Sequence, residues 1–241
     1  MEWSATSATD AYLDTLKLRC NDKWRCDSRV TREPGSNEFL SALAAGTKAK
    51  LIVEVTSGVS PSTAALAAAA RRTGGRLICI LPEPNLAESK QVIKDLGLKD
   101  MVEFKTDDPY KVLPNYEKID FSLVDCMNEE HTRLLKLLDV NPRRSVVVAN
   151  NLVGENKGLG GQVRGMEDKA VVRSMKHLIG KGKGMEVTMI EESNDFVDKK
   201  DQCPQPQMLR CDVNRKNHCS SKWVVKVDEE SGEEHIYRVC D

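Results

Sequence analysis

The chain has 241 residues, enough for one large domain or two small ones with a sizeable buried core. Its 36 Lys and Arg residues nearly balance 37 Asp and Glu residues, which gives a formal net charge of -1. This balance argues against a protein that binds nucleic acid through a surplus of positive charge. The longest apolar run, residues 64–70, is too short to span a bilayer, and no apolar secretory signal follows the N-terminus. We therefore expect an intracellular, cytoplasmic protein without a membrane partner.

Five short apolar runs in the first two thirds of the chain have the length of β-strands. These runs are Leu51–Val55, Leu77–Leu81, Met101–Phe104, Phe121–Val124 and Ser145–Ala149. Several of them are apolar without alternation, which is typical of strands covered on both faces in a parallel sheet. Helical patterns separate the runs. The repetition of strand, helix and strand predicts a three-layer α/β domain with a doubly wound, mostly parallel sheet.

The first helix of this predicted core has clear start and stop signals. Ser60 is a favourable N-cap, Pro61 suits the first helical position, and Gly74 follows the alanine-rich body as a left-handed stop. Two further helical patterns, at residues 7–18 and 38–45, precede the first strand, and a helix is also predicted at residues 169–179.

The composition divides the chain into four predicted regions. Residues 1–46 hold the N-terminal helices and a charged loop at 21–34, and residues 47–192 hold the α/β core. Residues 193–221 form a polar insertion that contains cysteines. Residues 222–241 contain two strand patterns around a turn, and we expect this antiparallel pair to complete the sheet.

Polar residues follow three of the predicted strands, where a doubly wound sheet binds its ligands. Glu54 and a turn of small residues follow the first strand, Asp125 follows the fourth, and Asn150 and Asn151 follow the fifth. One carboxylate and two amide oxygens are ligands that suit a hard cation such as Mg²⁺. The alternative interpretation is that Glu54, Asp125 and the two Asn residues cap turns or helices.

Short motifs stand in a characteristic order along this region. Val53-Glu-Val55 and Ser62-Thr-Ala-Ala-Leu66 flank the turn after the first strand, while Leu123-Val-Asp-Cys126 and Ala149-Asn-Asn-Leu-Val153 end the fourth and fifth. In this order, residues 34–153 resemble class I S-adenosylmethionine (SAM)-dependent methyltransferases. The likeness is greatest to the cation-dependent catechol and caffeoyl-coenzyme A O-methyltransferases.

Over its whole length the chain resembles a plant family catalogued as domain of unknown function 1442, which is usually labelled methyltransferase-like. The opening Trp3-Ser4, the strand Lys50-Leu-Ile-Val-Glu54 and the closing Asp228-Glu-Glu-Ser-Gly-Glu-Glu-His235 carry this likeness.

The resemblance implies a Rossmann-like methyltransferase fold, a small-molecule ligand and a homodimer. It assigns to SAM the residues Glu54, Thr56, Gly58, Ser60, Ser62 and Glu83. It assigns Asp125, Asn150 and Asn151 to a divalent cation such as Mg²⁺, and Asp125 also to catalysis. The chain departs from the pattern at three of these positions, because Thr56 and Ser60 stand where the cofactor loop has glycine and Asn150 replaces a carboxylate.

Three functional hypotheses follow. The first is a SAM-dependent O-methyltransferase that acts on a small molecule. The second is a catalytically degenerate methyltransferase fold that binds a ligand without turnover. The third is a protein-interaction module that uses residues 193–221 or an exposed strand edge.

Overall fold

The computed structural model describes residues 3–20, 35–125, 131–153, 170–179, 183–192, 222–227 and 234–239. The chain divides into two units, Met1–Ser193 and Asn194–Asp241, and each is described by itself. The predicted charged loop 21–34 and the predicted insertion 193–221 lie outside the described residues. In the described part of the chain, no helix is both long and apolar enough to cross a membrane.

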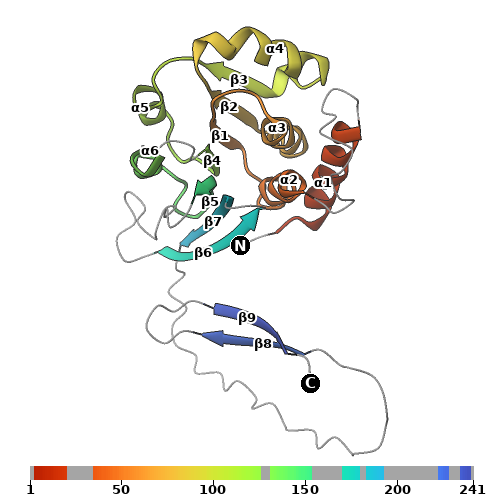
Figure 1. Cartoon of the computed structure of the whole chain (residues 1–241), viewed down its shortest axis with the longest axis vertical. Coiled ribbons are helices and arrows are strands. Elements are labelled where there is room, and N and C mark those ends of the chain that lie inside the picture. Colours follow the sequence, from red (N-terminus) through yellow and green to blue (C-terminus); the bar gives the residue numbers. More distant parts are fainter. Residues whose placement is uncertain are drawn as a thin grey trace, which may run out of the picture. The chain divides into compact units, whose positions relative to one another are not determined.

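The first unit is built on a seven-stranded sheet with the order β3-β2-β1-β4-β5-β7-β6 (Figure 1). The strands are β1 (Leu51–Val55), β2 (Arg76–Ile80), β3 (Val102–Lys105), β4 (Phe121–Asp125), β5 (Arg144–Val153), β6 (Ala170–Ile179) and β7 (Lys183–Glu192). Strands β1 to β5 are parallel, whereas β7 and β6 are antiparallel additions beyond β5. The predicted doubly wound, mostly parallel sheet is therefore confirmed.

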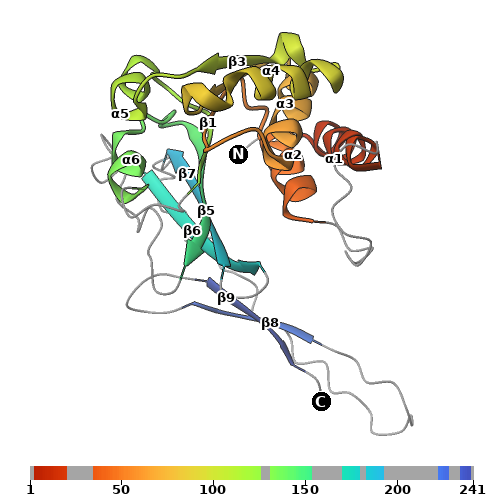
Figure 2. The same cartoon turned by 45° about the horizontal axis from the view of Figure 1, so that its top comes forward.

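Helices cover both faces of this sheet (Figures 1 and 2). One face carries α1 (Ala5–Cys20), α2 (Ser36–Gly46), α3 (Pro61–Thr73) and α4 (Leu86–Asp95), and the other carries α5 (Pro109–Val112) and α6 (His131–Leu137). Ile52 belongs to the apolar core under the first group of helices, and its neighbour Val53 belongs to the core under the second. Successive strand residues are thus both buried, which explains the unbroken apolar runs.

Short 3-10 helices connect several of these elements. They are Glu83–Asn85, Lys99–Met101 and Leu113–Asn115.

Helix α3 begins and ends as its sequence predicts. The Ser60 Oγ accepts a hydrogen bond from the Ser62 N–H at 3.3 Å, and the Thr63 Oγ1 accepts one from the Ser60 N–H at 3.1 Å. Gly74 ends the helix in the left-handed region, with φ of 64°. Because residues 64–70 are all buried, this helix is the central packing element on its face of the sheet.

The N-terminal helix α1 is attached to α3 by an ion pair in which the Asp14 carboxylate is nearly buried and the arginines are exposed. The Asp14 Oδ2 accepts hydrogen bonds from the Arg72 Nε at 2.7 Å and the Arg71 Nη2 at 3.4 Å, and it lies 2.6 Å from the Arg72 Nη2. Burial alone raises the pKa of Asp14, but the two arginines outweigh burial and hold that pKa below its ordinary value.

The amino ends of β1, β4 and β5 are held together by Asp120. Its Oδ2 accepts hydrogen bonds from the backbone N–H groups of Lys50 at 2.8 Å and Leu51 at 3.0 Å, and its Oδ1 accepts one from the Asn141 Nδ2 at 2.8 Å. The Asp120 carbonyl accepts a further bond from the Val146 N–H at 2.9 Å. These contacts close the amino edge of the sheet.

One sequence-based prediction differs from the structure. The segment predicted as helix 169–179 forms strand β6, which pairs with β7 over its whole length. Its β-branched residues and the adjacent strand outweigh its helical spacing.

The C-terminal segments form β8 (Lys222–Val227) and β9 (Glu234–Val239) as predicted. They pair with each other in an antiparallel two-stranded sheet within the second unit. That this pair completes the larger sheet stays a prediction.

Candidate functional site

A cavity of about 620 Å³ lies at the carboxyl ends of the central parallel strands. One wall consists of the loop after β1 and the first turn of α3, and a second wall comes from α4 with Glu88, Ser89 and Val92. Asp125 at the end of β4 and the Asn150–Asn151 pair on β5 complete the lining. Chain order reverses between β1 and β4, so the cavity stands at the switch point of the sheet, where α/β proteins bind ligands.

The loop after β1 is held in shape by side chains. The Thr56 Oγ1 donates a hydrogen bond to the Gly58 carbonyl at 2.9 Å and accepts a weak one from the Gly58 N–H at 3.4 Å. The Asn85 Nδ2 donates to the Ser57 carbonyl at 2.6 Å, which ties this loop to the start of α4. A methyl group added at Gly58 would contact only the Asn85 Nδ2, at 3.8 Å, so the loop itself does not require glycine there.

Glu54 is a fully buried carboxyl group directly behind the cavity lining. The Ser62 Oγ, which lines the cavity, donates to the Glu54 Oε1 at 2.7 Å, while the buried Oε2 has no hydrogen-bond partner. Burial raises the pKa of Glu54 from 4.5 to about 7; the Ser62 hydrogen bond lowers it, and the nearby charge of Asp125 raises it.

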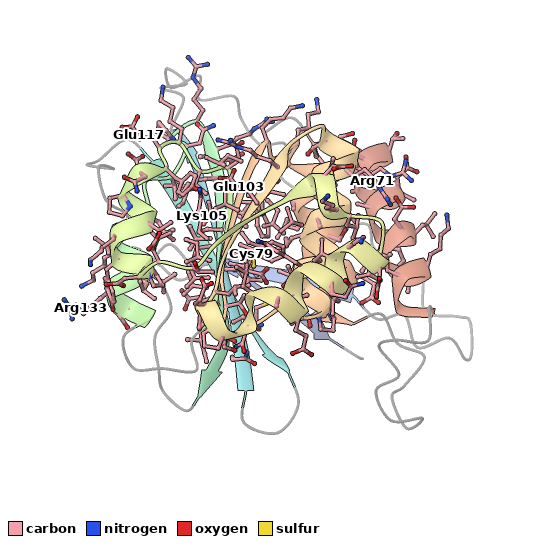
Figure 3. All side chains as sticks on the ribbon, turned by 90° about the horizontal axis from the view of Figure 1, so that it is seen from above. Arg71, Cys79, Glu103, Lys105, Glu117 and Arg133 are labelled. Atoms are coloured by element: carbon pink, nitrogen blue, oxygen red, sulfur yellow. The ribbon has the colours of Figure 1, made fainter. Side chains whose placement is uncertain are left out.

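Cys79 lies opposite Glu54 on strand β2 and is a buried free thiol. Figure 3 shows it at the centre of the side-chain layer, whereas Arg71 and Arg133 lie at the periphery. Burial and the adjacent Glu54 both raise the pKa of the Cys79 thiol, so it stays protonated and unreactive.

The ends of β4 and β5 bring three polar side chains together. Asp125 is the parallel partner of Asn150, and the Asn151 Nδ2 donates a hydrogen bond to the Asp125 Oδ1 at 2.8 Å. The pairing of β5 with β7 shifts between Ala149 and Leu152, so the two Asn residues form a bulge. Asn151 adopts a φ of 57°, a left-handed conformation that Asn tolerates better than most residues.

The structure brings most of the predicted site residues to one cavity. Those that line it are Thr56, Gly58, Ser60, Ser62, Asp125, Asn150 and Asn151. Glu54 lies behind Ser62, as described above. Glu83 is different: it is exposed in a 3-10 helix and is not among the residues that line the cavity. Pro82 and Pro84 on either side of it direct the chain away from the strand end.

The wall that α4 contributes was not predicted from the sequence. Glu88, Ser89 and Val92 line the cavity from this helix, and Asn85 lines it from the 3-10 turn just before α4. One signal was present, since polar Ser89 occupies a position four residues before the buried Ile93 and is itself buried. A buried serine on an amphipathic helix indicates contact with a polar region.

The cluster at the ends of β4 and β5 does not suit a divalent cation. Asp125 supplies one carboxylate, and Asn150 and Asn151 supply neutral amides, of which Asn151 already donates to Asp125. Affinity for Mg²⁺ or Ca²⁺ depends on the number of charged oxygen ligands. Among the described residues, no group of three His, Cys, Asp or Glu side chains is placed to hold a metal ion.

The chain was compared with protein families, curated proteins and solved structures. A family model described as "Protein of unknown function (DUF1442)" matches residues 1–239. No curated protein matches the chain. The structure is similar to the O-methyltransferase TomG of Streptomyces achromogenes in complex with SAM, with 20% identity, a TM-score of 0.52, and coverage of 78% of this chain and 91% of that one.

Two further solved structures share the fold. An O-methyltransferase from Bacillus cereus in complex with S-adenosylhomocysteine (SAH) is 18% identical, with a TM-score of 0.51 and coverage of 78% of this chain and 92% of that one. A SAM-dependent O-methyltransferase from Thermotoga maritima is 12% identical, with a TM-score of 0.52 and coverage of 75% and 72%. The chain therefore has the Rossmann-like fold of SAM-dependent O-methyltransferases, as the sequence predicts.

Proposed function

The chain belongs to the DUF1442 family of proteins of unknown function, and we propose that it binds SAM in the cavity at the ends of β1, β4 and β5 and transfers the methyl group to a hydroxyl group of a small molecule. SAM supplies an electrophilic methyl group on a positively charged sulfonium. The residues that would hold it are those of the loop after β1 and the first turn of α3, with Glu54 behind them.

The charge of the cavity carries this proposal. Asp125 and Glu88 line it, Glu54 lies directly behind Ser62, and no described lining residue is Lys, Arg or His. SAM bears positive charge on its sulfonium and its amino group and negative charge on its carboxylate, so it is a net cation. A site whose described charged groups are all acidic attracts such a ligand, because opposite charges attract each other.

The start of α3 supports the same choice of ligand. A helix N-terminus binds phosphate through free backbone N–H groups. Here Pro61 has no N–H group, and the Ser60 and Thr63 hydroxyls already accept hydrogen bonds from the N–H groups of Ser62 and Ser60. With these donors occupied and acidic side chains around them, the site favours a cationic ligand over a nucleotide phosphate.

The departures from the glycine-rich pattern are compatible with this function. The Thr56 hydroxyl is hydrogen-bonded within the loop, to both backbone groups of Gly58. The cavity beside it keeps a volume of about 620 Å³, within the usual range for sites that hold small molecules and cofactors.

Thermal unfolding with SAM, with SAH and with ATP tests the proposal. SAM at a hundred times its Kd should stabilise the protein by roughly 2.7 kcal/mol, which raises Tm by several degrees, whereas ATP should have no effect. Val92→Trp, which fills the cavity from α4, should abolish the shift. Lys90→Trp is the matched control, because Lys90 is exposed on the same helix.

Transfer of a radiolabelled methyl group to a panel of phenols and aliphatic alcohols then tests turnover. Label in at least one acceptor, lost in Val92→Trp, supports a methyltransferase. SAM binding without label transfer to any acceptor would contradict catalysis and leave a ligand-binding protein. Absence of any SAM or SAH effect would overturn the proposed function itself.

A further inference from the structure

We propose that the part of the cavity that binds the methyl acceptor, at Asp125, Asn150 and Asn151, works without a divalent cation. Asn151 holds the Asp125 carboxylate in place, and this carboxylate accepts a hydrogen bond directly from the hydroxyl group of the acceptor. This inference rests on the proposed function and deepens it. It departs from the cation-dependent branch to which the sequence is similar.

The donor set is the first argument. Asp125, Asn150 and Asn151 carry one negative charge between them, and an Asn occupies a position where the cation-dependent pattern has a carboxylate. The remaining carboxylate of the lining, Glu88, comes from α4 on the other wall. A hard dication gains most of its binding energy from charged oxygen ligands, so this set binds Mg²⁺ weakly.

The geometry of Asn151 is the second argument. The bulge between Ala149 and Leu152 and the left-handed backbone of Asn151 direct its side chain to Asp125, where the Nδ2 donates at 2.8 Å to Oδ1. To coordinate a cation held by Asp125, Asn151 would have to rotate its amide so that the oxygen replaces the Nδ2, and it would then lose this hydrogen bond. The bond instead fixes the orientation of the carboxylate, which makes Asn151 a positioning residue.

The remaining oxygen of Asp125 defines the acceptor chemistry. Among the described residues, Asp125 Oδ2 accepts no hydrogen bond, and Asp125 is only partly buried where it lines the cavity. A carboxylate oriented in this way accepts a hydrogen bond from one O–H group. The site therefore suits an acceptor with a single hydroxyl, and two adjacent hydroxyls that would chelate a metal offer no advantage.

Calorimetric titration of the protein with Mn²⁺, in the absence of SAM, tests this inference. The wild-type protein should show no binding at micromolar Mn²⁺. Asn150→Asp, which restores a second carboxylate opposite Asp125, should strengthen Mn²⁺ binding by about tenfold or more. Ala87→Asp adds the same charge at an exposed position of α4 outside the cavity lining and is the matched control, which should gain no such site. Micromolar binding by the wild-type protein would overturn the inference.

The SAM-induced shift in Tm and the turnover of a one-hydroxyl acceptor are then compared in excess EDTA and in millimolar Mg²⁺. Equal turnover supports a cation-free acceptor side, and turnover that disappears in EDTA contradicts it. A protein that fails to respond to SAM under either condition would refute the proposed function, while the Mn²⁺ titration would still decide the inference. Asn151→Gly removes the donor and tolerates the left-handed backbone. It should weaken turnover of a one-hydroxyl acceptor in EDTA more than it weakens SAM binding, and equal losses of turnover and of SAM affinity would contradict the positioning role.

Discussion

The hydroxyl group of Ser62 and the carboxyl group of Glu54 form a 2.7 Å hydrogen bond that joins the first turn of α3 to the buried end of β1. Only one oxygen of Glu54 is satisfied in this way, because Oε2 is buried without a partner. An ionised carboxylate in that position destabilises the folded protein. A positively charged ligand in the adjacent cavity would offset that cost, so the same group opposes stability and favours binding.

Glu54→Gln should stabilise the protein at high pH. Because burial raises the Glu54 pKa from 4.5 to about 7, the folded state retains a proton that the unfolded state releases between these values. Stability therefore falls as pH rises from 4.5 to about 7 and remains low above that, a loss of about 3 kcal/mol at most. Gln keeps an acceptor for the Ser62 hydroxyl and does not titrate.

Urea unfolding of wild-type and Glu54→Gln proteins, at pH values of about 5 and about 8, measures this effect. The variant should gain stability relative to the wild type at the higher pH and bind SAM more weakly. Glu88→Gln is the control for the stability measurement alone, since Glu88 is an exposed carboxylate whose removal should leave the pH profile of unfolding unchanged. Identical pH profiles for wild-type and Glu54→Gln proteins would show that Glu54 is not held in a protonated state.

The ion pair between α1 and α3 predicts acid sensitivity. The arginines hold the Asp14 pKa below its ordinary value of 3.8, so the unfolded state takes up a proton before the folded state does. This contribution is complete above pH 3.8 and is lost as pH falls through the lower, folded-state pKa. Asp14→Asn should flatten the acid limb of the Tm profile and lower Tm near neutral pH.

The exposed pair of Arg76 and Glu103, 3.9 Å apart on β2 and β3, provides the control for that experiment. Arg76→Met should change Tm little, since exposed ion pairs contribute at most about 1 kcal/mol. An acid limb as steep in Asp14→Asn as in the wild type would assign acid unfolding to other carboxyl groups.

Asp120→Ala should be strongly destabilising although Asp120 is far from the cavity. The substitution leaves the backbone N–H groups of Lys50 and Leu51 and the Asn141 amide without their acceptor. Each such loss costs about 1–3 kcal/mol, so a total of about 3 kcal/mol or more is expected from urea unfolding. Asp107→Ala, at an exposed position, should remain within about 0.5 kcal/mol of the wild type. Equal effects of the two substitutions would show that the hydrogen bonds of Asp120 at the amino ends of β1, β4 and β5 do not stabilise the fold.

The sequence predicts the parallel strands well because burial on both faces produces unbroken apolar runs, as Ile52 and Val53 illustrate. It also predicts α3, whose signals at Ser60, Pro61 and Gly74 are local. Strand β6 was missed because its conformation depends on pairing with β7, a tertiary contact that periodicity does not encode.

In the candidate site too, features encoded locally in the sequence were predicted, whereas features that depend on tertiary contacts were not. Residues that lie at strand ends, such as Asp125 and Asn151, were placed together correctly because parallel strands end at one edge of the sheet. Glu83 does not line the cavity, and the α4 wall was not predicted, because the course of the chain after β2 depends on the prolines around Glu83 and on the packing of α4. The hydrogen bond from Asn151 to Asp125 depends on a bulge and a left-handed residue, for which the sequence shows only a pair of Asn residues.

Substitution by alanine should lower the free energy of unfolding at one glycine, Gly75, and leave it unchanged at another, Gly58. A methyl group at Gly75 would lie 2.5 Å from the Lys50 carbonyl oxygen and 2.8 Å from its Cα, so backbone at the start of β1 must move. Gly75→Ala should therefore destabilise the protein by about 1–3 kcal/mol, as overpacking does elsewhere. At Gly58 the methyl group meets only the Asn85 amide at 3.8 Å, so Gly58→Ala should leave the free energy of unfolding unchanged.

The same Gly58→Ala variant should weaken SAM binding, because Gly58 lines the cavity and the added methyl group narrows the approach of a ligand to the loop. Urea unfolding and titration with SAM on one protein preparation separate the two effects. A loss of stability in Gly58→Ala would show that the loop needs glycine for its own conformation. Unchanged SAM affinity in a stable Gly58→Ala protein would place the ligand away from this loop and against the α4 wall instead.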